Sequence, residues 1–361
     1  MKRIIALVKK RKILWISVLC FLLAGPLLVM PVTSAIVYEA IFSTRYETAE
    51  WMKFSVEDFE GLLLERSDFE ADRGVTLAGY CYSKADTAEP RGVVVISHGM
   101  GGGGHNQYLP FVDAFTTQGY AVFAYDARGN DNSGGKDIEG LPQGVIDLDY
   151  ALKHVATLPA YQGLPVLLFG HSWGAYSAGN VLNFHPEVQA AVLIAGFNES
   201  RDMLLYQSEE RVGVLARASI FYVTAYEKLK FGKAFTEISA VEGMKNSDAR
   251  VMIVHSMDDE TVPVEYGYDI YYEAFSDHER FEFVLYEDRG HSYLFYSDAS
   301  REYKEALNAD YLEYVKSHGG EFNAEIKTEF MNLYLDKARC FEPDPALMEK
   351  IFVMFEEAIA F

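Results

Sequence analysis

Short runs of apolar, often β-branched residues alternate along the chain with segments whose apolar residues recur at helical spacing. Unbroken apolar runs of this length are typical of strands buried on both faces of a parallel sheet. The predicted strands are residues 75–82, 93–97, 120–125, 166–170, 190–195, 251–255 and 281–286. The predicted helices are residues 106–117, 145–158, 173–183 and 346–360. This repeated order predicts right-handed crossovers and an α/β fold with a doubly wound, mostly parallel sheet.

Two longer helical segments interrupt the alternation. Residues 198–249 lie between two predicted strands and are rich in aromatic side chains, and an insertion at this place would form a cap over the carboxyl ends of the strands. Residues 299–339 predict two amphipathic helices, whose apolar stripes we expect to pack on the core rather than to contact a substrate. Beyond them, Asp344 as N-cap and Pro345 in the first turn mark the start of the last helix.

The N-terminal region has the pattern of a membrane anchor. Residues 1–12 are basic and contain no acidic residue, and the uncharged segment 13–38 follows them. Its first part, residues 13–32, is strongly apolar and has the roughly 20 residues that a helix needs to cross a bilayer. We therefore predict that residues 1–12 are cytoplasmic and that residues 13–38 are a transmembrane signal anchor. The positive-inside rule then places the rest of the chain outside the cytoplasm.

A cleaved signal peptide is the alternative. The sequence Thr33-Ser34-Ala35 could serve as a cleavage site, and the protein would then be secreted. The length of the apolar run favours the uncleaved anchor, because signal peptides have shorter apolar regions. Residues 39–68 are predicted to be a juxtamembrane connector, and residues 69–361 to form the folded α/β domain.

Charge and cysteine content exclude several classes of protein. The chain contains 32 basic and 53 acidic residues, for a formal net charge of -21, so the body of the protein would repel a nucleic-acid backbone. Cys20, Cys81 and Cys340 have no metal-binding spacing. A Cys81–Cys340 disulfide stays open if both lie outside the cytoplasm, although two isolated buried thiols are favoured. No motif requires a metal or a cofactor.

One motif carries chemistry by its position. Gly170-His171-Ser172-Trp173-Gly174 matches G-x-S-x-G between a predicted strand and a predicted helix. The glycines allow a tight turn that lifts the serine above the sheet, and the helix N-terminus places backbone N–H groups beside it. Ser172 is therefore the candidate nucleophile.

A nucleophilic serine needs a base and an acid that orients the base. His291 follows a later predicted strand and is the candidate base, and Asp259 in the loop after strand 251–255 is the candidate acid. All three residues follow carboxyl ends of strands, where ligands bind in such sheets. Asp258 is the near rival of Asp259, and Glu199 is a distant one.

The glycine-rich loop after strand 93–97 permits two interpretations. Acyl transfer needs donors for the developing oxyanion, and the backbone amides of Met100 in this loop and of Trp173 are the candidates. The same loop also fits G-x-G-x-x-G, with Asp126 at the end of the next strand, which is a dinucleotide-binding pattern. We give that pattern low weight, because it leaves Ser172, Asp259 and His291 unexplained.

Together these motifs resemble the α/β-hydrolase superfamily from about residue 69 onward, and more narrowly its serine aminopeptidase and monoacylglycerol-lipase-like branch. The matching residues are His98-Gly99-Met100-Gly101, Asp126-x-Arg128-Gly129 with Ser133, Gly170-His171-Ser172-Trp173-Gly174, Asp259 with Val262-Pro263, and Gly290-His291. The resemblance implies an α/β-hydrolase fold with an eight-stranded, mostly parallel sheet, helices on both faces and a helical cap after the sixth strand.

The resemblance also implies a triad of Ser172, Asp259 and His291 with oxyanion donors at Met100 and Trp173. Two positions depart from the branch: Asp131 and Ser256 stand where glycine is usual.

We therefore expect a membrane-anchored serine hydrolase that cleaves carboxylic esters or lipids through an acyl-enzyme, without a cofactor. A peptidase stays open, because Glu199, Glu209 and Glu210 could bind a free amine. A catalytically inactive binding module at the cell envelope is the rival from another class, and a dinucleotide-dependent oxidoreductase is the third alternative.

Overall fold

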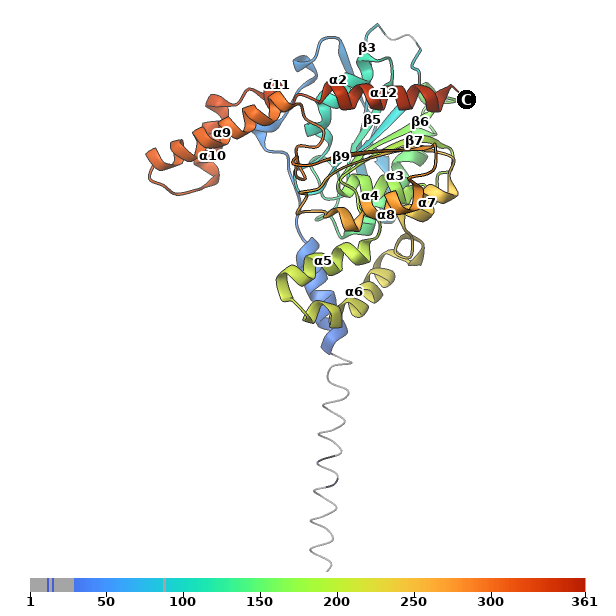
Figure 1. Ribbon diagram of the computed structural model, residues 1–361, viewed down its shortest axis with the longest axis vertical. Helices are drawn as coiled ribbons and strands as arrows, with labels where there is room; N and C mark the ends of the chain where they lie inside the picture. Colours follow the sequence, from blue (N-terminus) through green and yellow to red (C-terminus); the bar gives the residue numbers. More distant parts are fainter. Residues whose placement is uncertain (1–11, 13–14, 16–28, 87–88, 361) are drawn as a thin grey trace, which may run out of the picture.

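The computed structural model describes residues 12, 15, 29–86 and 89–360 (Figure 1). Most of the predicted membrane anchor, residues 13–38, lies outside this described part, as does almost all of the basic segment 1–12. Residues 29–42 form a helix that packs on the protein, with the Tyr38 side chain buried. Within the described residues, no helix is both long and apolar enough to cross a membrane.

A central sheet organises the domain. Its strands run in the order β1-β3-β5-β4-β6-β7-β8-β9, and β2 pairs with β3 beside this path. Strands from β5 to β9 are parallel along the path, whereas β1 and β3 are antiparallel to their neighbours. The strands are β1(Leu62–Arg66), β2(Phe69–Glu70), β3(Thr76–Lys84), β4(Val93–Ser97), β5(Ala121–Asp126), β6(Val166–His171), β7(Val188–Ile194), β8(Arg250–Ser256) and β9(Phe281–Tyr286). The predicted mostly parallel α/β sheet is thus confirmed.

The sheet has nine strands where eight are predicted. The additional strand, β2, is two residues long, too short to leave a pattern in the sequence. The sheet also begins at Leu62, inside the segment 39–68 for which the sequence predicts a connector. In β1 only Leu62 is buried, so this edge strand lacks the alternation that identifies a half-buried strand.

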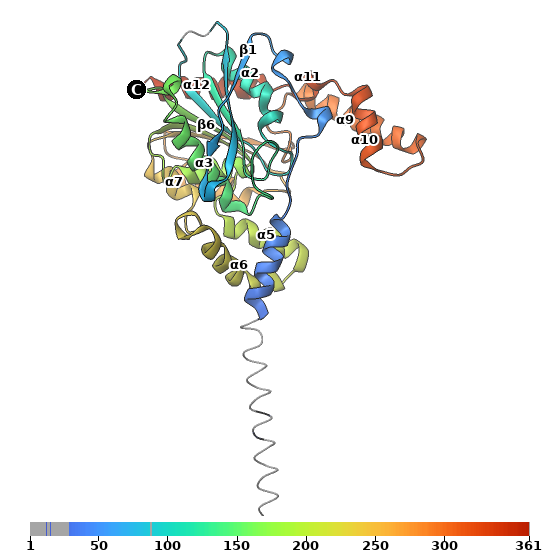
Figure 2. The ribbon, with the colours of Figure 1, turned by 180° about the vertical axis from the view of Figure 1, so that it is seen from behind.

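Helices cover both faces of the sheet, as predicted (Figures 1 and 2). In β4, Val93 and Val95 pack in the core beneath α3 and α4, whereas Val94 and Ile96 pack in the opposite core with α2 and α12. The helices are α2(Leu109–Thr117), α3(Leu141–Val155), α4(Trp173–Val181), α5(Ser200–Val212), α6(Leu215–Phe231), α7(Ala240–Asn246), α8(Tyr268–Phe275), α9(Asp298–Ser317), α10(Ala324–Tyr334), α11(Lys337–Cys340) and α12(Pro345–Ile359). Short 3₁₀ turns occur at η1(Glu50–Met52), η2(Val56–Asp58), η3(Asp72–Gly74), η4(His105–Tyr108), η5(Pro159–Tyr161), η6(Lys233–Phe235) and η7(Val264–Tyr266).

Helices α9, α10 and α11 form an arm that projects from the side of the domain (Figure 1). The arm occupies the insertion predicted at 299–339, and α9 and α10 are two amphipathic helices there. Leu307, Tyr311, Val315 and Phe330 form a small apolar cluster between them. The apolar stripes therefore pack mainly on each other, and not on the core of the sheet.

Helices α5 and α6 form a cap after β7, and the helix of residues 29–42 lies against them (Figures 1 and 2). Three polar contacts fix this helix to α6. The Tyr38 hydroxyl donates to Glu227 Oε1 at 2.8 Å, and Glu39 accepts from the Tyr226 hydroxyl at 2.8 Å and pairs with Lys230. The N-terminal helix is thus held on the cap by specific hydrogen bonds.

Glu227 is a buried carboxyl group at the centre of this contact. Its two oxygens also accept hydrogen bonds from the Ser200 hydroxyl, at 2.9 and 3.0 Å. Burial raises the pKa of Glu227 to about 7, because removal from water disfavours the charged form. The carboxyl is therefore protonated in the folded protein at mildly acidic pH, where the unfolded chain has already lost this proton.

This difference predicts a specific pH dependence of stability. The contribution of Glu227 is fully present below the unfolded pKa of about 4.3 and is lost as the pH rises through about 7. Glu227→Gln cannot ionise, so its free energy of unfolding should gain on that of the wild type by up to about 3 kcal/mol between about pH 4.5 and pH 8. Urea denaturation of both proteins at several pH values checks this. A constant difference across the range would contradict the assignment.

Candidate active site

Ser172 lies in the turn between β6 and α4. Its backbone has φ 55° and ψ −117°, a conformation that is strained for a residue other than glycine. The Ser172 N–H donates to the carbonyl oxygen of Ile194 on the neighbouring strand at 2.7 Å. This contact fixes the turn to the edge of the sheet.

Gly170 and Gly174 are required on either side of this turn. A Cβ atom on Gly174 would lie 1.9 Å from the carbonyl oxygen of Ser97, and one on Gly170 would lie 2.5 Å from the carbonyl oxygen of Gly174. The start of α4 therefore packs directly against the backbone that leaves β4. The two glycines of the sequence motif are needed because the two backbones approach each other this closely.

His291 bridges Ser172 and Asp259. Its Nε2 atom lies 2.9 Å from Ser172 Oγ, and its Nδ1 atom lies 2.8 Å from Asp259 Oδ2. Because an ionised carboxylate can only accept, Nδ1 carries the proton and Nε2 is left to accept from the serine hydroxyl. The three residues predicted from the sequence are thus in one hydrogen-bonded chain.

The Asp259 side chain is fully buried, and every contact favours its charged form. The backbone N–H groups of Thr261 and Val262 both donate to Oδ1 at 2.9 Å. Burial by itself would raise the pKa of Asp259, but the contacts with His255 and His291 outweigh this effect and hold the pKa below its ordinary value. Asp259 is therefore an anion that orients the imidazole.

The other two acids considered for this role lie elsewhere. Asp258 turns to the loop of residues 288–291, where its Oδ1 accepts from the Gly290 N–H at 2.8 Å and from the Ser256 hydroxyl at 2.6 Å. Glu199 is the residue before the first turn of α5. Within the described part of the chain, Asp259 is the carboxylate that contacts His291.

Ser256 has a structural role that the sequence does not reveal. Its hydroxyl donates to Asp258 and accepts the Arg289 N–H at 2.9 Å, so Ser256 and Asp258 together hold the backbone two residues before His291. The only signal in the sequence is that Ser256 departs from the glycine usual in the branch. The departure adds a second tether to the loop that carries the candidate base.

Arg289 connects the same loop to the base of the projecting arm. Its guanidinium donates to Asp344 at 2.9 Å, to the carbonyl oxygen of Tyr296 at 2.8 Å and to Asp298 at 3.0 Å. Asp298 is the first residue of α9, and Asp344 is the N-cap of α12. The two ends of the arm thus meet at one buried cation.

His171, the variable residue of the G-x-S-x-G motif, supports His291 from below. Its Nε2 donates to the carbonyl oxygen of His291 at 3.3 Å, and its Nδ1 accepts from the Tyr108 hydroxyl at 3.0 Å. Burial lowers the pKa of His171 to about 3, so this imidazole is neutral at neutral pH. It is a structural neighbour of His291 that the sequence analysis does not assign.

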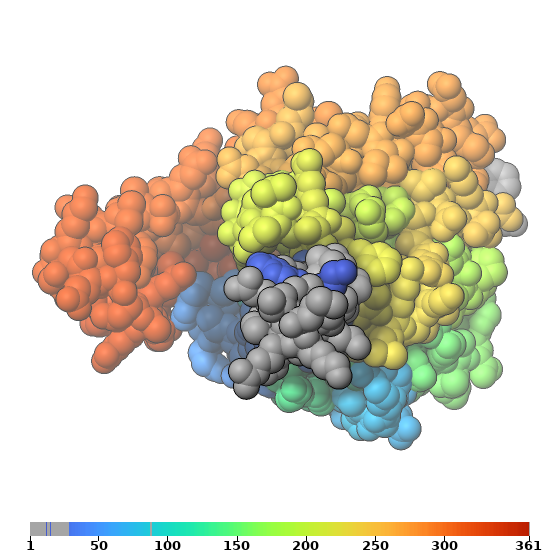
Figure 3. All heavy atoms as spheres, turned by 90° about the horizontal axis from the view of Figure 1, so that it is seen from below, coloured from blue at the N-terminus to red at the C-terminus, as the bar shows by residue number. Residues whose placement is uncertain are grey.

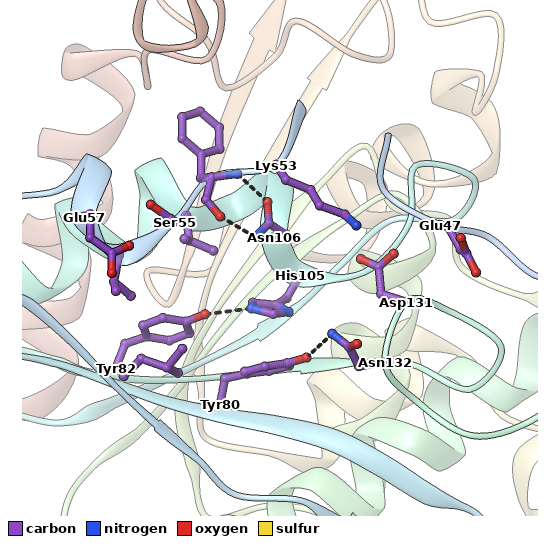
Figure 4. Close-up of a pocket in the computed structure, with 14 residues that line it drawn as sticks. Glu47, Lys53, Ser55, Glu57, Tyr80, Tyr82, His105, Asn106, Asp131 and Asn132 are labelled. Atoms are coloured by element: carbon purple, nitrogen blue, oxygen red, sulfur yellow. Dashed lines mark hydrogen bonds between the residues drawn. The ribbon is translucent and has the colours of Figure 1, made fainter. Parts of the chain in front are cut away.

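Asp126 does not have the position that dinucleotide binding requires. It is fully buried, and its Oδ1 accepts from His105 Nδ1 at 2.7 Å. His105 Nε2 in turn accepts from the Tyr82 hydroxyl at 2.7 Å, beside a cavity of about 450 Å³ that none of the triad residues lines (Figure 4). A carboxylate used in this way cannot bind the ribose of a cofactor, so the dinucleotide interpretation is wrong.

Asp131, the other residue that departs from the pattern of the branch, also has a structural role. Its carboxylate accepts from the backbone N–H of Thr48 at 2.6 Å, from the Thr48 hydroxyl at 2.7 Å and from the Gly104 N–H at 2.9 Å. It therefore ties the segment that follows the N-terminal helix to the glycine-rich loop.

Cys81 and Cys340 are both free thiols, and Cys20 lies outside the described residues.

Ser172 opens into a cavity of about 210 Å³ between the sheet and the cap. Met100 and Trp173, the predicted oxyanion donors, both line it, and Trp173 is the first residue of α4, where a helical N–H has no partner within the helix. The other walls are mainly apolar and include Phe42 from the N-terminal helix, Leu141 from α3, Met203 and Leu204 from α5, and Val262 from the loop after β8. Water-excluding walls of this kind suit an apolar substrate group.

Parts of the sequence are similar to a protein family and to curated proteins. A family model described as serine aminopeptidase, S33, matches residues 88–218. A monoglyceride lipase homolog of monkeypox virus is 34% identical over 100 residues, which are 27% of this chain and 34% of the relative. Protein ABHD12B of Homo sapiens is 28% identical over 218 residues, 57% of each chain. The chain thus spans between a third and somewhat over half of the length of these curated relatives.

Solved structures show the same fold. A Pyrococcus furiosus esterase superposes with a TM-score of 0.53 at 16% sequence identity, and the match covers 76% of this chain and 98% of the esterase. The likeness is one of fold, and at 76% of this chain it is longer than the segment 88–218 that the family model matches.

The packing of Gly174 predicts the cost of enlarging it. Gly174→Ala should lower the melting temperature strongly or prevent folding, because the new methyl group would overlap the Ser97 carbonyl oxygen. Gly163→Ala is the matched control: it has φ +79° and open space, so only backbone strain of about 1–2 kcal/mol applies. Thermal unfolding followed by circular dichroism compares the two. Equal losses would contradict the close approach.

Proposed function

We propose that the protein is a membrane-anchored serine hydrolase of the α/β-hydrolase superfamily that cleaves carboxylic esters. One observation carries the proposal: His291 joins the buried Asp259 carboxylate to Ser172 Oγ, and Ser172 lines an apolar cavity. A serine in such a chain has its proton acceptor already in place, which is what acyl transfer requires.

In the proposed reaction, Ser172 Oγ attacks the ester carbonyl carbon while His291 Nε2 takes the hydroxyl proton. Asp259 stays ionised and stabilises the imidazolium that forms. The tetrahedral intermediate collapses when its C–O bond to the alcohol breaks and His291 protonates the leaving oxygen. A water molecule, activated by the same imidazole, then hydrolyses the acyl-enzyme and restores Ser172.

The developing negative charge on the carbonyl oxygen needs fixed donors. We assign these to the backbone amides of Trp173 and Met100. Both residues line the Ser172 cavity, one at the start of α4 and the other in the loop after β4. The strained turn at Ser172 directly precedes the Trp173 amide.

The cavity favours esters over peptides with a free amine. None of the described residues that line it is acidic, whereas a peptidase that recognises an amino terminus needs a carboxylate there. Glu199, Glu209 and Glu210, which could have supplied it, lie outside this lining, and Glu209 pairs with Arg217. The similarity to a monoglyceride lipase homolog points in the same direction. A peptidase remains the second candidate because of the family description.

We assign the anchor to residues 13–38, with the apolar run 13–32 as its membrane-crossing part because Tyr38 is buried against the cap, and we assign the hydrolase domain to the extracytoplasmic side. The basic segment 1–12 precedes an apolar run long enough to cross a bilayer. Cleavage near residues 33–35 would release the domain, but it would also remove part of the helix that packs on the cap. Ser34, at this cleavage site, is buried in the packed helix, which favours an intact chain.

A fluorophosphonate probe tests the nucleophile. The full chain is expected to form a covalent adduct on Ser172, and Ser172→Ala is expected to form none, because only a serine with an adjacent base attacks the probe at a useful rate. Mass spectrometry of the peptide that contains residue 172 locates the adduct. A folded wild-type protein without an adduct would favour an inactive binding module instead.

The two neighbouring aspartates provide a matched pair of variants. Asp259→Asn should lower kcat for an activated ester by about 10⁴-fold, because the amide cannot hold His291 in the required tautomer. Asp258→Asn affects only the hydrogen bonds from the Ser256 hydroxyl and the Gly290 N–H and should lower kcat by about 10-fold or less. Steady-state kinetics on both variants decides between them. The reverse order of effects would reassign the acid to Asp258.

A further inference from the structure

We propose that the helix of residues 29–42 is one wall of the substrate site, and that the groove between this helix and the cap binds a single long fatty-acyl chain of the ester. The inference rests on the proposed ester hydrolysis and adds the class of acyl group and its path. Its first support is a second cavity, of about 350 Å³, which lies open to solvent between the N-terminal helix and helices α5 and α6.

This outer cavity adjoins the cavity of Ser172. Ile41, Leu204, Ser208 and Arg211 line both, so these side chains form the boundary between the two spaces. An acyl group bound to Ser172 Oγ would extend from the inner cavity toward this boundary. The outer cavity is the continuation that a longer chain would enter.

The groove has apolar walls that the protein itself leaves uncovered. Val37 on the N-terminal helix and Val212 and Leu215 on the cap line the outer cavity, and they are 55%, 53% and 67% exposed. Each methylene buried against such walls contributes about 0.8 kcal/mol. An acyl chain would cover these three side chains together.

The length of the groove selects long chains. Lining residues of the N-terminal helix extend from Met30 to Phe42, a span of roughly 18 Å at the rise of an α-helix. A short acyl group would stay in the inner cavity beside Ser172, whereas an extended long-chain acyl group would run along the helix. The site therefore distinguishes chain lengths in its outer half.

The N-terminal helix is a fixed wall. Tyr38 donates to the buried Glu227, and Glu39 pairs with Lys230 and accepts from Tyr226, so the helix is tied to α6. Figure 3 shows its blue atoms next to the yellow-green atoms of α5 at this end of the molecule. A preformed groove avoids the cost of ordering the site when the chain binds.

The direction of the groove agrees with a lipid source. Met30 marks its outer end, and the preceding residues belong to the apolar run that we assign to the membrane. A lipid could therefore leave the bilayer alongside the anchor and reach Ser172 without exposing its acyl chain to water.

Chain-length kinetics with two tryptophan variants test the groove. In full-length protein, Val37→Trp should lower the ratio of kcat/KM for p-nitrophenyl palmitate to that for p-nitrophenyl butyrate by about 10-fold, because the indole occupies the space of several methylenes. Ile36→Trp is the matched control: Ile36 is exposed, lies on the same helix and lines neither cavity. Its ratio should stay within about twofold of wild type. Equal ratios for the two variants would overturn the proposal.

A photoreactive probe separates this proposal from the proposed function. The experiment does not depend on enzyme activity, so it uses the full-length Ser172→Ala variant. This protein is irradiated with palmitic acid that carries a terminal diazirine, and the cross-links are mapped by mass spectrometry. Cross-links to Val37, Val212 or Leu215 that excess palmitate suppresses would support the groove, even if wild-type protein hydrolyses no ester. Cross-links only elsewhere, cross-links between two copies of the chain, or none at all would overturn it, even if butyrate esters are cleaved.

Discussion

Parallel pairing of β6, β7, β8 and β9 decides where chemistry can occur in this protein. The register aligns His171 with Ile194, Ile194 with Val254, and Ser256 with Tyr286, so these strands end at one edge of the sheet. The loops that follow these strands therefore all begin at this edge of the sheet. Ser172 and His291, 119 residues apart in the chain, meet within hydrogen-bond distance for this reason. The cap and the N-terminal helix can only cover a site that this edge has already assembled.

The parts of the fold that could be predicted are those with a local signature. Continuous apolar runs mark the central strands, and G-x-S-x-G marks a turn in which Gly174 must accept a backbone neighbour. The edge strands β1 and β2 leave no such mark, since β1 buries only Leu62 and β2 has two residues. Asp258 and Asp259 could not be separated from the sequence, because adjacent residues in a loop point in different directions that only the folded backbone fixes.

The two departures from the branch pattern show the same limit. A serine at 256 and an aspartate at 131 look like random exchanges for glycine in the sequence. In the structure, the side chain of each one joins segments that are distant in the chain. Ser256 makes hydrogen bonds to Asp258 and to the backbone of Arg289, and Asp131 accepts hydrogen bonds from Thr48 and Gly104. Likewise, the position of the N-terminal helix on the cap depends on Glu227, which lies 189 residues from Tyr38. Long-range contacts of this kind leave no periodic pattern in the sequence, so they cannot be predicted from it.

The clamp at Arg289 has a consequence for how the molecule opens. The arm of α9 and α10 has only a small cluster of its own around Tyr311 and Phe330, so its outer part can unfold locally at low cost. Its base cannot do so independently, because Asp298 and Asp344 share the Arg289 guanidinium with the backbone that leads to His291. The base of the arm and the loop of His291 therefore form one cooperative unit. Amide hydrogens in these two places exchange with solvent in the same opening event, while the tip of the arm exchanges on its own.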